Sequence, residues 1–511
     1  MIPNAWLQAV ICVGFFAGAV YETVAVTRFP RDETYAQTNG IGIVLLYLLY
    51  ALVGAACLLW PSIVSLCRKG KEKGEKPSAP APAPSYEAKA PAPAPTRKSK
   101  LYYLSHMKTF LTFIVVAFHV VCQFSTDTGD GLGTTHIMLQ FGITEGIDIS
   151  SFDESAMSAA SFSQFVFGQT FIMANQLYFM SAFFFLSGIF CPTSLDRKGF
   201  RAFVLDKLMR LGGPFLMANY ALFPLLSVAA NAFAGQPLPQ YAPHHGPTWF
   251  IFWLLNFSVT YAAIAQFTPT IKIKLPHPAL ITLGSIALGV VWFSLDILVS
   301  GTPWMEIWNQ AMMMFLPFYI SFFAAGIIAG RNGWLETIVS MPRWSRWVLR
   351  AFLLCCLALL AAGWALCPGF ILAVFFGSIP SSPWAWIASS IVGTYCTGMT
   401  LALIQVFHEF FNVNTTFLGA MGAAAYAVYI IHPYFYNVAI YLFVEILKAS
   451  HVPIVFESGP IYLTTDDAGE PAVLSGGMLW GGQTFVFVLT QLTVWPAAYY
   501  LRKLPVLNKM L

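Results

Sequence analysis

A lysine and a histidine eleven residues apart in one apolar stretch are the first candidates for chemistry. Lys108 lies near the start of LSHMKTFLTFIVVAFHVV, and His119 lies deep within it. Eleven residues are about three helical turns, or roughly 16 Å, so one helix would place both side chains on nearly the same face. A charged side chain within hydrocarbon costs roughly 2.5 to 3.5 kcal/mol, so it is seldom there without a partner or a task.

Depth in the membrane suggests a different role for each residue. His119 would lie near the middle of a membrane helix, where a neutral imidazole can act as a general base. Lys108 would lie at the membrane surface, where its ammonium can hold the anionic group of a long substrate. The alternatives are a buried histidine hydrogen-bonded to a neighbouring helix, and a lysine that only anchors the helix end.

A second basic group follows in the segment SLDRKGFRAFVLDKLMRLGGP. Lys207 and Arg210 are three residues apart and Arg201 lies upstream, a spacing that predicts a cationic face on a short helix. Arginine offers a planar fork and lysine a point charge, so this face can bind phosphate groups. Basic residues are, however, typical of any cytosolic loop of a membrane protein.

Tyr426, Tyr429 and His432 recur every three residues in AAAYAVYIIHPYFYN. They would share one helix face, and Pro433, the residue directly after His432, would kink the helix. This face and Trp249, shortly after HHGP, are candidates for lining a cavity, although packed aromatic rings beside a kink give the same pattern. No cysteine pair has the spacing of a metal site, so we expect no metal. We also expect no tightly bound cofactor.

The elements that must position these residues are membrane helices. Of the 511 residues, 57% are hydrophobic, 16% are aromatic and only 10% are charged, and the mean hydropathy is +0.67. This composition excludes an ordinary soluble protein, and nothing in it supports nucleic-acid binding. We predict an all-α protein, a polytopic transmembrane helical bundle with about ten spans in the main domain plus an N-terminal two-helix hairpin.

The composition divides the chain into three regions. Residues 1–67 form the hairpin, residues 68–100 form a disordered tether rich in Lys, Pro and Ala, and residues 101–511 form the main domain. The expected spans of the main domain are 109–125, 166–190, 212–234, 248–268, 277–300, 307–329, 347–366, 385–408, 421–447 and 478–501.

The distribution of basic residues predicts the orientation of the bundle. Of the 27 lysines and arginines, all except Arg28, Arg31 and Lys448 lie in the tether, in one set of alternating loops or at the span ends that adjoin those loops. Loops rich in lysine and arginine face the cytosol, so both termini and the tether are predicted to be cytosolic. The protein would be an integral, multi-pass component of the plasma membrane or of an endomembrane.

Six stretches of the main domain occur in the order YYLSHMKTFLTFIVVAFHVV, MSAFFFLSGIFCPTSLDRKGF, LDKLMRLGGPFL, HGPTWFIFWLL, FFAAGIIAGRNGWLE and AAYAVYIIHP. In this order they resemble the acyltransferase 3 family of integral-membrane acyltransferases, and in particular its glucan succinyltransferase-type members. The resemblance covers most of residues 101–511 and leaves out the hairpin and the tether.

This resemblance implies transfer of a short acyl group, acetyl or succinyl, from cytosolic acyl-CoA to a hydroxyl of a carbohydrate or lipid-like acceptor. His119 would be the family's histidine and act as the general base. Lys108, Lys207 and Arg210 would bind acyl-CoA, which is a co-substrate rather than a resident cofactor. Many members have arginine where this chain has Lys108, and paired arginines where it has Lys207 and Arg210, so part of the bidentate contact would be lost here.

A multi-pass transporter of an anionic or glycan-type substrate is the alternative, because many spans and buried polar groups are equally natural in transporters. The two halves of the sequence show no internal repeat and no matched pair of helices interrupted by glycine or proline. These observations favour the acyltransferase.

Overall fold

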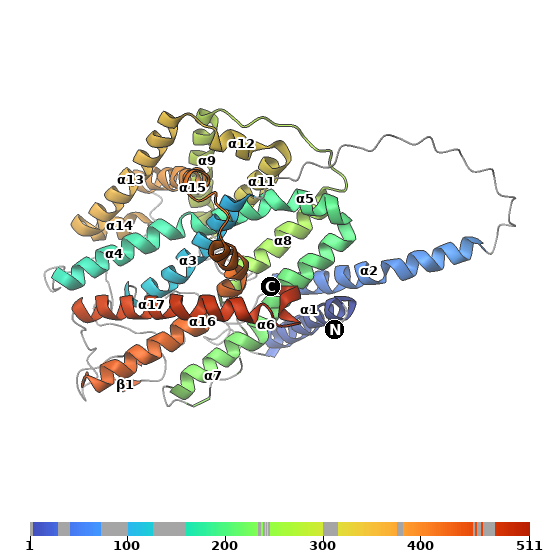
Figure 1. Ribbon diagram of the computed structural model, residues 1–511, viewed down its shortest axis with the longest axis horizontal. Helices are drawn as coiled ribbons and strands as arrows, with labels where there is room; N and C mark the ends of the chain where they lie inside the picture. Colours follow the sequence, from blue (N-terminus) through green and yellow to red (C-terminus); the bar gives the residue numbers. More distant parts are fainter. Residues whose placement is uncertain are drawn as a thin grey trace.

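Long apolar helices make up most of the part of the chain that the computed structural model describes (Figure 1). In that part, the only strands are an antiparallel pair of two residues each, β1 (Val455–Phe456) and β2 (Ile461–Tyr462). The prediction of an all-α polytopic bundle is therefore confirmed. The residues described are 4–28, 41–72, 101–125, 159–233, 237–238, 241, 243, 246–299, 315–375, 382–452, 455–456, 461–462 and 476–511.

The helices follow one another along the chain with short π-helical or 3₁₀-helical segments between some of them. Those segments are η3 (Leu208–Gly212), η4 (Ala218–Leu222) and η5 (Gly246–Thr248). The α-helices are α1 (Asn4–Arg28), α2 (Ile41–Glu72), α3 (Tyr102–Ser125), α4 (Ala159–Gln176), α5 (Phe179–Lys207), α6 (Gly213–Met217), α7 (Phe223–Phe233), α8 (Trp249–Ile264), α9 (Pro278–Val299), α11 (Leu316–Asn332), α12 (Trp334–Val339), α13 (Arg343–Leu366), α14 (Pro368–Phe375), α15 (Pro383–Phe410), α16 (Thr416–Ala449), α17 (Gly476–Leu501) and α18 (Leu507–Met510).

Ten of the described segments are long and apolar enough to cross a membrane, and the helices α1 and α2 supply two of them. One segment, Phe162–Ala229, runs from α4 to α7 and covers more than one expected span. The expected span 166–190 is divided between α4 and α5. The division occurs at Leu177 and Tyr178, where Tyr178 leaves the helical conformation with φ −134° and ψ −30°.

Helix α2 extends past the predicted end of the hairpin. Helix α2 continues to Glu72, beyond the predicted end of the hairpin at residue 67. The rest of the predicted tether, residues 73–100, lies outside the described residues.

Helix α3, which carries both Lys108 and His119, is the most completely buried of the described spans. It contacts α4, α5, α15, α16 and α17, and it lies near the centre of the molecule in Figure 1. Helix α13, in contrast, exposes most of its apolar surface, as expected for a helix that faces lipid. The central position of α3 brings other helices around its histidine.

Two glycines of α5 shape the part of the bundle next to α3. A Cβ atom built on Gly188 would lie 3.1 Å from the Cα atom of Gly326 on α11, so these helices touch backbone to backbone. Further along α5, Gly199 has a φ of 71°, a left-handed conformation that glycine adopts without strain. The resulting bend redirects the end of α5, which carries Lys207.

Candidate active site

Two buried histidines from different helices meet beside α3. The ring of His119, whose residue is 3% exposed, lies 5.0 Å from the ring of His432 on α16, measured between ring centroids. The His119 ring is also nearly parallel to that of Tyr436, at 6.1 Å and an interplanar angle of 4°. The structure thus brings together two residues that the sequence had singled out separately.

The hydrogen bond of His432 defines its tautomer. Its Nδ1 atom lies 2.8 Å from the carbonyl oxygen of Tyr429, and because a carbonyl can only accept, Nδ1 must be the donor. In a neutral ring Nε2 is then an acceptor, and among the described residues no group hydrogen-bonds to it. His432 is fully buried, so this nitrogen is suited to receive a hydrogen bond from a hydroxyl that enters the site.

Tyr426 and Tyr429, on the same face of α16, connect this helix to other elements. The hydroxyl of Tyr426 donates to the carbonyl oxygen of Arg210 at 2.6 Å, and that of Tyr429 donates to the carbonyl oxygen of Pro247. Trp249, directly after η5, is 3% exposed and stacks on Tyr319, with ring centroids 5.5 Å apart. These contacts show packed side chains, and the role of this group in lining a cavity stays a prediction.

Lys108 on α3 lies near Lys207 at the end of α5, and these two residues together with Arg210 in η3 are called the basic end of the site. The Lys108 ammonium lies 4.3 Å from the ring centroid of Phe190 on α5, and its charge is close enough to that of Lys207 for the two to repel each other. Lys207 itself lies over the ring of Phe203. No ion pair joins either lysine to a carboxylate within the described part of the chain. An anion placed between them would relieve their repulsion.

Arg210 is close to a carboxylate, and Arg201 has a different role from the one its spacing suggested. Asp206 pairs with Lys198 at 2.5 Å and with Arg210 at 3.4 Å, so positive charge exceeds negative charge in this segment. Arg201 donates from Nε to the carbonyl oxygen of Cys57 on α2 and is held by the hairpin. Nothing in the spacing of the basic residues indicated that contact, because its acceptor is a backbone oxygen.

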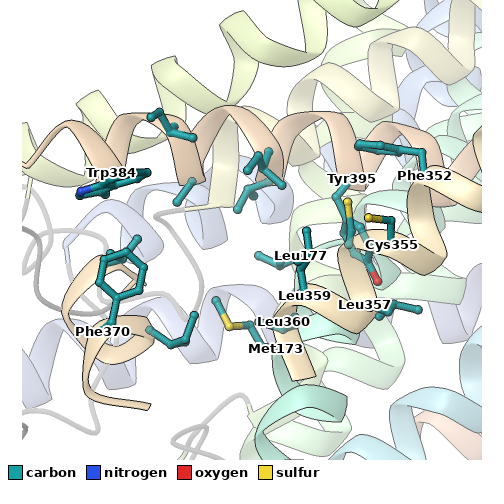
Figure 2. A pocket seen from close by; sticks show the side chains of 17 residues that line it. Met173, Leu177, Phe352, Cys355, Leu357, Leu359, Leu360, Phe370, Trp384 and Tyr395 are labelled. Carbon is teal, nitrogen blue, oxygen red and sulfur yellow. The ribbon is translucent and has the colours of Figure 1, made fainter. Parts of the chain in front are cut away.

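The two cavities described lie elsewhere, among α4, α13, α14 and α15. One of about 390 Å³ extends from Phe370 and Trp384 to Tyr395, Phe352 and Cys355 (Figure 2). The other, of about 770 Å³, lies between α4 and α13 and shares Tyr395. Their walls are apolar, and none of the predicted site residues lines either one.

The arrangement can therefore accept a proton in the buried interior and hold an anion at one end of the same helix. Within the described residues, no group of three or more His, Cys, Asp or Glu side chains is placed to hold a metal ion.

Comparison with known proteins identifies the main domain. Neither the curated proteins nor the solved structures contain a match to this chain. A family model described as an acyltransferase domain matches residues 101–499, which excludes the hairpin and includes every residue of the histidine pair and of the basic end. The match covers well over half of the sequence, and the chain belongs to the acyltransferase 3 family of integral-membrane acyltransferases.

Proposed function

We propose that the protein transfers a short acyl group, acetyl or succinyl, from acyl-CoA to a hydroxyl of a carbohydrate or lipid-like acceptor. The observation that carries this proposal is the buried pair of His119 and His432 in a chain that is an acyltransferase. An O-acyl transfer requires a base for the acceptor hydroxyl, and a neutral imidazole is the usual base at neutral pH.

Acyl-CoA is proposed as the donor because the basic end of the site suits a polyanion. Lys108, Lys207 and Arg210 would hold the CoA phosphates on the cytosolic side, to which the positive-inside rule assigns the basic loops as a prediction. The roughly 16 Å along α3 between Lys108 and His119 is a distance that an extended pantetheine arm can span. The thioester would then lie beside the histidine pair.

In the proposed reaction His119 takes the proton of the acceptor hydroxyl as its oxygen attacks the thioester carbonyl. The new C–O bond forms the ester, the C–S bond breaks, and the proton passes from His119 to the departing thiolate, giving free CoA. The Nε2 atom of His432, to which no group among the described residues hydrogen-bonds, would accept a hydrogen bond from a second hydroxyl of the acceptor and so help to orient the hydroxyl that reacts. A positioned general base typically contributes about 10² to 10⁴ in rate.

The test is transfer by the purified protein in lipid nanodiscs. Wild-type protein would be incubated with acetyl-CoA or succinyl-CoA and a panel of glycans and lipids, with CoA release and the added acyl mass as readouts. We expect His119→Ala to lose transfer by about 10² or more. A transporter would instead move its substrate without releasing CoA.

The matched control is His106→Ala. His106 is a second buried histidine of α3, with Nδ1 2.6 Å from the carbonyl oxygen of Phe411, away from the histidine pair. The His106→Ala variant should keep most of the wild-type transfer rate. Full activity of His119→Ala would exclude His119 as the base.

A further inference from the structure

The N-terminal hairpin lies outside the family match, yet it packs against the segment that carries Lys207 and Arg210 (Figure 1). That segment, residues 201–222, passes from the end of α5 through η3, α6 and η4. Its two π-helical stretches are unusual, because π-helix is rare and is concentrated at functional sites. What holds this irregular backbone in place therefore bears directly on the basic end of the site.

Side chains and glycines interlock across this contact in both directions. A Cβ atom on Gly212 would lie 2.8 Å from the ring of Phe15 on α1, so only glycine leaves room for that ring. Conversely, a Cβ atom on Gly54 of α2 would meet the Sγ atom of Cys12 within the hairpin first, and it would also lie 3.0 Å from the side chain of Leu208. Such close approach at small residues is how helices associate specifically within a membrane.

Phe15 is the centre of the contact on the hairpin side. It is fully buried, and its ring lies 5.5 Å from that of Tyr47 and 5.4 Å from that of Tyr50, between ring centroids. The neighbouring Phe16 is 56% exposed on the outer face of the same helix. The two adjacent phenylalanines thus have opposite surroundings.

Polar contacts hold the same segment on both sides of Lys207 and Arg210. Upstream, Arg201 donates to the carbonyl oxygen of Cys57. Downstream, the hydroxyl of Tyr220 donates to the carboxylate of Glu22 at 2.9 Å, and Glu22 is 1% exposed. A buried carboxylate is expensive in a membrane unless it is hydrogen-bonded, so this contact favours one docked position of the hairpin.

We propose that the hairpin is a positioning element for the donor site: it fixes the backbone on both sides of Lys207 and Arg210, with Phe15 as its central residue. The proposal rests on the proposed binding of acyl-CoA by those two side chains. The hairpin makes the basic end rigid before the donor binds, so that less conformational entropy is lost on binding.

The test compares Phe15→Leu with Phe16→Leu in the full-length protein in nanodiscs. Acetyl-CoA or succinyl-CoA is the probe, whichever the wild type uses. Phe15→Leu should raise the KM for the donor about 5- to 10-fold and leave kcat within about 2-fold, because it loosens binding rather than chemistry. Phe16→Leu should change neither constant. Gly212→Ala, which pushes on the Phe15 ring from the other side, is a second variant and should raise KM in the same way.

Arg210→Glu separates this proposal from the function on which it rests. If Arg210→Glu raises the donor KM while Phe15→Leu and Gly212→Ala leave it unchanged, the positioning role is overturned and the donor site stands. A fall in kcat at constant KM in Phe15→Leu would also overturn it, because it would show a purely structural role. If none of the three variants changes KM while the wild type transfers acyl groups, the assignment of the donor site fails and this proposal fails with it.

Discussion

Helix α3 carries the two ends of the candidate site, and they are built in opposite ways. At the histidine pair the surroundings are buried and aromatic, and a backbone carbonyl fixes which nitrogen of His432 carries the proton. At the basic end the lysine ammonium groups lie over aromatic rings, and the nearby Asp206 is shared by two other cations. One end holds His432 in a defined tautomer beside the proposed base His119, whereas the other keeps an excess of positive charge.

This difference suggests how the work of the site is divided. A general base acts best with its lone pair aimed at one place, and a binding site for phosphate groups needs several charges close together. Substitutions at the histidine end should therefore reduce kcat, and those at the basic end should raise the KM for the donor.

The largest effect is expected for His432→Gln, which tests whether the histidine end controls kcat rather than the KM for the donor. Glutamine is similar in size, but it cannot hold the Tyr429 carbonyl oxygen and offer an acceptor in the same geometry. We expect kcat to fall about 10- to 100-fold with little change in the KM for the donor, measured by CoA release. A rise in KM at constant kcat would show that His432 acts in donor binding rather than in the chemical step, which contradicts the division between the two ends.

Charge reversal at the other end should give the opposite result. Arg210→Glu removes a cation and places a second carboxylate beside Asp206. The KM for acyl-CoA should rise by about 10-fold or more while kcat at saturating donor is retained, and the effect should weaken as salt is added. Lys274→Glu, in an exposed connection between α8 and α9, reverses an equal charge and should leave KM unchanged. An equal change in both variants would mean that only net charge matters.

The spans were predictable, but the contacts between them were not. The length of an apolar stretch and the number of charges in it are local properties, so the all-α bundle and the helix with His119 could be predicted from the sequence. The pairing of His119 with His432 depends on how α3 and α16 pack, and helices far apart in sequence carry no mutual spacing signal. The role of Arg201 was missed for a related reason, since its partner is the backbone of a helix outside the matched domain.

The smallest effect is expected for a substitution of Lys108, the position at which the resemblance to the family implies arginine in many members. Lys108→Arg keeps the charge, can stack on Phe190 and adds a planar fork, so the KM for the donor should stay equal to that of the wild type or fall by about 2- to 3-fold. Lys108→Met keeps the apolar length of the side chain without its charge, and it should raise KM about 10-fold. If Lys108→Met binds the donor as well as the wild type, Lys108 only anchors α3, and the basic end consists of Lys207 and Arg210. The division between the two ends of α3 would then have to be redrawn, because its charged end would no longer lie on α3 itself.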